Sequence, residues 1–150
     1  MAFTEAQRQT LDAVLDVLIP PGDDGRLPGA GQLHLAGAVE AQLAAMPPLA
    51  EMVGQGLTAL EAIAARRGGA FATLAADARA AALDELNGGE HGFPPVLALY
   101  GYAAYYQQPR VLEAIGLEPR PPHPAGYKTI AGDLSLLAPV RQRGRIWRDA

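Results

Sequence analysis

The sequence predicts an all-α fold: a compact bundle of about five to six helices, followed by an extended proline-rich C-terminal tail. Three observations support this fold class. Alanine and leucine are abundant among the 150 residues, and only 6% of the residues are aromatic. Apolar residues recur at helical spacing through residues 1–116. Clusters of proline and glycine separate these periodic segments, as expected for helices joined by turns.

The first helix is predicted over residues 4–19. Thr4, with Gln7 three residues later, is typical of a capping box at a helix start. Pro20 and Pro21 then end the helix, because proline lacks an N–H and restricts the residue before it. The apolar stripe of this helix consists of Leu11, Val14, Leu15 and Leu18.

A loop rich in Gly, Pro and Asp follows over residues 20–31, and we interpret it as flexible, with solvated carboxylates at Asp23 and Asp24. Further helices are predicted over residues 32–46, 48–67, 73–86, 94–106 and 109–115. Pro47-Pro48 ends the second helix and suits the first turn of the third. The predicted apolar face of the second helix consists of Leu35, Val39, Leu43 and Met46.

The character of the chain changes after Gly116. Residues 117–127 hold too many prolines for a helix or a sheet, and the residues after them contain too few apolar side chains to build a core. We therefore expect a helical domain over residues 1–116 and an extended tail over residues 117–150, which is either disordered or wrapped around a partner.

Composition limits the possible functions. A net charge of −4 and a pI near 5.3 argue against general nucleic-acid binding, which needs a basic face. The absence of cysteine excludes disulfides, thiolate metal sites and cysteine nucleophiles. No apolar run has the length of a membrane span, so we expect no direct membrane insertion. No secretory or twin-arginine signal is recognisable, which favours the cytoplasm.

Residues that could carry chemistry are few and scattered. His34, His91 and His123 lie in separate segments, and no metal-binding spacing accompanies them. Ser135 is the only serine and lies in no nucleophile elbow. The glycines around Gly25 form no dinucleotide fingerprint. The sequence therefore predicts no catalytic, cofactor-binding or metal site in this chain.

Aromatic residues are the stronger functional signal. Tyr102, Tyr105 and Tyr106 share one face of the predicted fifth helix, beside small residues that allow close approach. Either core packing or a partner interface explains them, since tyrosine combines apolar area with a polar tip. Trp and Arg at the C-terminus are also typical interface anchors. The candidate partner-binding residues are Tyr102, Tyr105, Tyr106, His123, Tyr127, Arg145, Trp147 and Arg148.

Two separated motifs together resemble the gluconate 2-dehydrogenase subunit 3 family. The first is Leu18-Ile19-Pro20 with the acidic loop and Pro28-Gly29-Ala30. The second runs from Tyr105-Tyr106-Gln107-Gln108-Pro109 through Ile115-Gly116 and Pro121-Pro122 to Gly126-Tyr127. Each motif is short and only moderately specific, but their order and spacing carry the resemblance over about residues 5–127.

The resemblance implies an accessory role. Members of that family are small subunits of bacterial sugar and polyol dehydrogenases whose large subunit is a flavoprotein of the glucose–methanol–choline type. It implies that FAD resides in the large subunit, that a cytochrome subunit often accepts the electrons, and that the small subunit supports maturation and stability in a heterodimer. Periplasmic export, through the partner's signal or a trimmed twin-arginine signal, is the alternative location.

Two other functions remain open at this point. The chain could be a stand-alone helical binding module, with the tyrosine face forming a homodimer. It could also be a small independent enzyme, although no constellation of residues supports that interpretation. Co-purification with a yellow large subunit would separate the accessory role from both.

Overall fold

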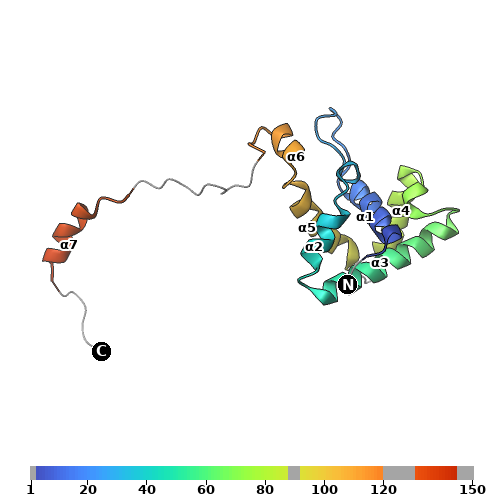
Figure 1. The fold of residues 1–150 in the computed structure, drawn as a ribbon, viewed down its shortest axis with the longest axis horizontal. Helices are drawn as coiled ribbons and strands as arrows, with labels where there is room; N and C mark the ends of the chain where they lie inside the picture. Colours follow the sequence, from blue (N-terminus) through green and yellow to red (C-terminus); the bar gives the residue numbers. More distant parts are fainter. Residues whose placement is uncertain (1–2, 88–91, 120–130, 145–150) are drawn as a thin grey trace. The chain divides into compact units, whose positions relative to one another are not determined.

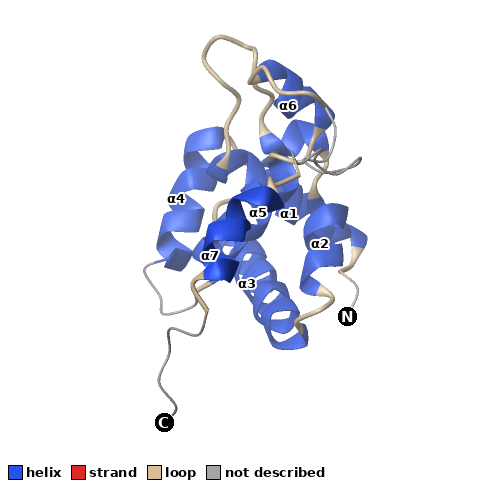
Figure 2. Cartoon of the chain, turned by 90° about the vertical axis from the view of Figure 1, so that its left-hand side faces the viewer, coloured by secondary structure: helices blue, strands red, loops and turns tan. Residues whose placement is uncertain are grey.

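The computed structural model describes residues 3–87, 92–119 and 131–144, and these form helices and loops without any strand (Figure 2). The predicted all-α class is confirmed. The chain divides into two units, residues 1–120 and residues 121–150. We call the first unit the body; α1 to α6 lie in it. Among the described residues, no helix combines the length and apolarity needed to cross a bilayer.

Helix α1 (Glu5–Leu18) is the central helix of the body (Figure 1). It contacts α2 (Ala36–Leu43), α3 (Pro47–Arg66), α4 (Ala76–Asn87) and α5 (Phe93–Tyr105). Leu11, Val14 and Leu15 are completely buried, as their helical spacing predicts. The predicted capping box is also confirmed: Thr4 accepts a bond from the Gln7 backbone N–H at 3.2 Å, and the Gln7 side chain accepts one from the Thr4 N–H at 3.0 Å.

Polar residues of α1 connect it to its neighbours. The buried Thr10 hydroxyl donates to Glu61 of α3 at 2.6 Å, and Glu61 also accepts from the Phe71 N–H in the 3₁₀ turn η2 (Phe71–Thr73). The Arg8 guanidinium donates to Glu40 of α2 at 2.9 Å, and this bond lowers the pKa of the Glu40 carboxyl. These hydrogen bonds fix the orientation of α1 relative to α2 and α3, in addition to the burial of its apolar side chains.

The predicted second helix, residues 32–46, differs from the structure. A 3₁₀ turn, η1 (Ala30–Leu33), comes first, and His34 then adopts a left-handed conformation (φ 49°) before α2 begins. The cause lies on α1, where two carboxylates one turn apart bind η1 and the start of α2 separately. Asp16 accepts from the Gly31 N–H at 3.2 Å, and Asp12 accepts from the Ala36 N–H at 2.8 Å.

The other predicted helices lie close to their observed positions. Those over residues 48–67, 94–106 and 109–115 correspond to α3, α5 and α6 (Pro109–Ala114), with ends that differ by one residue at most. The predicted fourth helix starts later, because η2 occupies its first residue. Met46 was predicted on the buried face of the second helix, but α2 ends at Leu43 and Met46 is 39% exposed.

Two glycines allow α5 to approach the other helices. A methyl group at Gly56 of α3 would overlap the ring of the completely buried Phe93, lying 2.6 Å from its Cγ. A methyl group at Gly101 would lie 2.7 Å from Cδ2 of Leu15 on α1. The position of α5 in the body therefore depends on the absence of side chains at these two positions.

We expect the Gly56→Ala substitution to lower the free energy of unfolding by about 1–3 kcal/mol, because overpacking displaces a buried ring. The matched control is Gly37→Ala on α2, where nothing lies within 4 Å of the added methyl group. There the higher helix propensity of alanine should raise stability by up to about 1 kcal/mol. Urea denaturation of both variants measures the difference, and equal effects would contradict the tight α3–α5 contact.

Candidate functional site

The loop over residues 20–31 is held by several backbone bonds. The Ala30 N–H donates to the Ile19 carbonyl, and the Gly22 N–H donates to the Leu27 carbonyl, both at 2.9 Å. Asp23 and Asp24 are exposed, as the interpretation of solvated carboxylates predicts. Asp24 also accepts a bond from the Arg26 N–H at 3.0 Å. The loop thus has defined internal hydrogen bonds while its acids face solvent.

One hydrogen bond joins the two separated sequence motifs. The Tyr105 hydroxyl donates to the Pro28 carbonyl at 2.8 Å, across 77 residues of sequence. Pro28, Gly29 and Ala30 are all buried, and Tyr105 is only 2% exposed. Burial raises the pKa of the Tyr105 hydroxyl. The two motifs therefore meet as one contact between the loop and α5.

Of the two alternatives left open for the three tyrosines, core packing holds for Tyr105. Its ring points into the core, whereas Tyr102 is 44% exposed and Tyr106 is 49% exposed. Tyr102 and Tyr106 stack with ring centroids 6.1 Å apart, and Tyr106 also meets the edge of Tyr105 at 5.3 Å. Consecutive helical residues point about 100° apart, so Tyr105 and Tyr106 face different surroundings.

Leu99 extends the exposed tyrosine pair along α5. It is 66% exposed and precedes Tyr102 by three residues and Tyr106 by seven, so the three side chains lie on one side of the helix. We call these residues the α5 stripe. Leu99 was not among the predicted interface residues, although the sequence holds a signal for it: residues 92–109 contain no Asp, Glu, Lys, Arg or His. A helix whose exposed side carries no charged residue is unusual, because solvated helix surfaces are normally rich in charge.

The loop also holds the end of α6. The Arg26 guanidinium donates to the Ala114 carbonyl at 2.9 Å, which satisfies an acceptor at the helix C-terminus. Gly116 has a positive φ of 80°, and the Leu117 N–H donates back to the Leu112 carbonyl at 2.8 Å. This arrangement is a Schellman-type helix end. The loop therefore positions α5 and α6 together.

The tail candidates His123, Tyr127, Arg145, Trp147 and Arg148 lie outside the described residues. Residues 131–144 are described, and they contain a 3₁₀ turn, η3 (Leu134–Leu137), and the short helix α7 (Ala138–Gln142). This helical segment was not predicted from the sequence. Asp133 caps it by accepting from the Ser135 N–H at 3.0 Å. Its exposed apolar residues are Leu134, Leu136, Leu137 and Val140.

Titratable groups gather in one shallow pocket beside α1. Asp12, Asp16, His34 and Arg79 contribute to its lining, and Nδ1 of His34 lies 3.6 Å from Oδ2 of Asp12. Partial burial raises the pKa of Asp12. Both carboxylates already accept backbone N–H bonds, and Arg79 donates to the carbonyls of Leu74 and Ala72. These groups organise the surrounding backbone.

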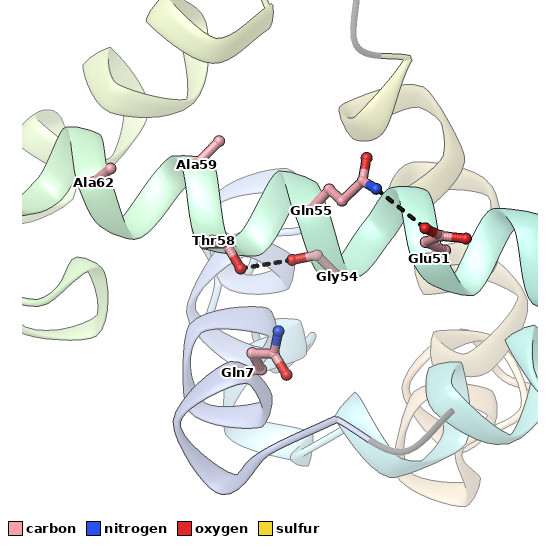
Figure 3. A pocket seen from close by; sticks show the side chains of 7 residues that line it. All are labelled: Gln7, Glu51, Gly54, Gln55, Thr58, Ala59 and Ala62. Atoms are coloured by element: carbon pink, nitrogen blue, oxygen red, sulfur yellow. Dashed lines mark hydrogen bonds between the residues drawn. The ribbon is translucent and has the colours of Figure 1, made fainter.

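A second hollow lies between the start of α1 and one side of α3 (Figure 3). Small and amide-bearing side chains line it, and Glu51 is its single titratable group. Thr58 donates to the Gly54 carbonyl at 3.0 Å, and Gln55 donates to Glu51 at 3.3 Å. Within the described ranges, no group of three or more His, Asp or Glu side chains could hold a metal ion.

Comparison with known proteins identifies one family. The model of the family described as gluconate 2-dehydrogenase subunit 3 matches residues 5–116, which is most of the chain. The resemblance inferred from the two motifs is thereby confirmed over the matched range. Searches of curated proteins and of solved structures found no significant match.

The Tyr105→Phe substitution tests the bond between the two motifs. We expect it to lower the free energy of unfolding by about 1–2 kcal/mol, because the buried Pro28 carbonyl loses its donor. Tyr106→Phe is the matched control, and its exposed hydroxyl should change stability by less than about 0.5 kcal/mol.

The pH dependence gives a second measurement for the same variant. Because the folded-state pKa of Tyr105 is raised, the native state holds this proton more tightly than the unfolded state. Its contribution to stability is complete below a pH of about 10, the ordinary tyrosine pKa, and declines at higher pH. Thermal melts across this range should show a steeper decline for the wild type than for Tyr105→Phe, and parallel curves would contradict the assignment.

Proposed function

We propose, since this chain belongs to the gluconate 2-dehydrogenase subunit 3 family, that it is a non-catalytic small subunit of an FAD-dependent sugar or polyol dehydrogenase. Its role is to bind and stabilise the large subunit, a flavoprotein of the glucose–methanol–choline type that holds the FAD. A cytochrome subunit is a further partner in this proposal. The family description, which makes the chain a subunit of a dehydrogenase, is the observation that carries the proposal.

The partners of the body's carboxylates support a non-catalytic role. Asp12, Asp16, Glu40 and Glu61 each accept a hydrogen bond from a backbone N–H. Glu40 and Glu61 in addition bind Arg8 and Thr10, respectively. These acids therefore already serve to hold the backbone and helices of the body in place. The sequence also contains no cysteine that could serve as a nucleophile or ligand.

Exposed apolar side chains support a binding role. In the part of the body that the structure describes, the exposed large apolar residues include Leu99, Tyr102 and Tyr106 on α5, and Ile115 and Leu117 after α6. Burial of such surface in a complex is favourable at roughly 25 cal/mol per Å² before the costs of association. A subunit that binds the folded flavoprotein stabilises it by mass action.

Purification of the chain alone and with its flavoprotein tests this function. We expect the isolated chain to be colourless between 350 and 500 nm and inactive in dye-reduction assays with sugars. Co-expression with a glucose–methanol–choline-type flavoprotein of the same organism should yield one yellow complex in size-exclusion chromatography. Stoichiometric flavin or turnover in the isolated chain would overturn the accessory role, and separate elution would favour a stand-alone binding module.

Truncation tests the proposed partner contact of the tail. The buried apolar core of the described residues extends from Phe3 to Val111, so removing residues 121–150 deletes none of it. We expect the shortened chain to keep its helical circular dichroism and its melting temperature within a few degrees. Binding to the flavoprotein should be lost, because His123, Tyr127, Arg145, Trp147 and Arg148 are proposed contacts. A shortened chain that unfolds would place the tail in the core of this protein.

A further inference from the structure

We propose that the α5 stripe (Leu99, Tyr102 and Tyr106) docks into an uncharged, apolar groove of the flavoprotein large subunit. The identity of the partner rests on the function proposed above. The position of the contact and the chemistry of the surface opposite it come from the body of this chain.

The stripe has the geometry of a preorganised docking face. Its three side chains are between 44% and 66% exposed and lie at i, i+3 and i+7 on α5, which is the spacing by which a helix enters a groove. Tyr106 stacks on Tyr102 and contacts the edge of the buried Tyr105. These ring contacts restrict both exposed tyrosines before binding and reduce the entropy that docking costs.

The absence of charge defines what can lie opposite the stripe. Residues 92–109 contain no charged or histidine side chain, although the whole chain has a net charge of −4. A charged group of the partner would lose its hydration against this stretch without gaining a counter-ion from within it, which is unfavourable. The complementary surface is therefore apolar, with hydrogen-bond acceptors placed for the tyrosine hydroxyls at its edge.

Size argues against a second copy of this chain as the occupant. From Leu99 to Tyr106 the stripe extends roughly 10 Å at about 1.5 Å per residue. A stable interface buries about 1,200–2,000 Å² in total, whereas a side chain of this kind buries at most about 150–250 Å². The half-exposed stripes of two copies, packed against each other, would bury less than this area. A large subunit that also contacts the tail, as proposed above, adds buried area beyond the stripe.

Titration calorimetry of the full-length chain with the purified flavoprotein tests the inference. We expect Tyr102→Ala and Leu99→Ser each to raise Kd, Tyr102→Ala by at least about tenfold, as for buried interface aromatics. Thr58→Ala, an exposed position on the other hollow, is the control and should leave Kd within about twofold. Thermal melts should show that all three variants remain folded, because the substituted side chains are exposed.

The outcomes separate the two proposals. If the wild-type chain does not bind the flavoprotein, the proposed function fails. If the wild type binds and both stripe variants bind equally well, the α5 stripe is not the docking surface while the proposed function stands. The ratio of variant to wild-type Kd should be the same at low and high salt, and a ratio that falls strongly with salt would overturn an uncharged groove. A homodimer that Leu99→Ser dissociates in sedimentation experiments would make a second copy the occupant.

Discussion

The burial of α1 is the constraint on which the other elements depend. Leu11, Val14 and Leu15 of its apolar stripe are completely buried, because the other helices of the body surround them. Its polar side chains then determine how they do so: Arg8 and Thr10 bind α2 and α3, and Asp16 and Asp12 bind η1 and the first residue of α2. Hydrophobic burial supplies the driving force, and the directional bonds select one arrangement among those that bury the same stripe.

The motif Pro28-Gly29-Ala30 has a physical explanation in this arrangement. A side chain at Gly29 would collide with the Asp16 carboxylate, and one at Gly31 would lie 2.7 Å from the Asp16 Cβ. Pro28 supplies the carbonyl that Tyr105 binds, and Ala30 is completely buried. The loop is therefore shaped by close contact with α1 on one side and by a hydrogen bond from α5 on the other. Its exposed acids contribute little to these contacts.

Most helices could be predicted because their local signals agree with their burial. The capping box at Thr4 and the proline at the start of α3 mark ends that the structure confirms. The break at His34 could not be predicted, because its cause is a pair of carboxylates on α1 that are distant in sequence. The burial of Tyr105 could not be decided from the sequence, and the exposure of Leu99 was missed, for another reason. Helix α5 is apolar on all sides, so hydrophobic periodicity cannot indicate which side faces the core.

Tyr105 and Tyr106 are adjacent in the second motif, and they have different roles in forming the α5 stripe. Tyr105 faces inward and fixes the loop that also holds α6 through Arg26. Tyr106 faces outward and stacks with Tyr102 in the α5 stripe. Because the rings of Tyr105 and Tyr106 touch, the loop, α5 and the stripe form one connected structure. The buried Tyr105 hydroxyl therefore serves folding stability, whereas the exposed Tyr106 ring serves partner affinity in the docking proposal. The motif therefore couples the integrity of the body to the presentation of its uncharged face.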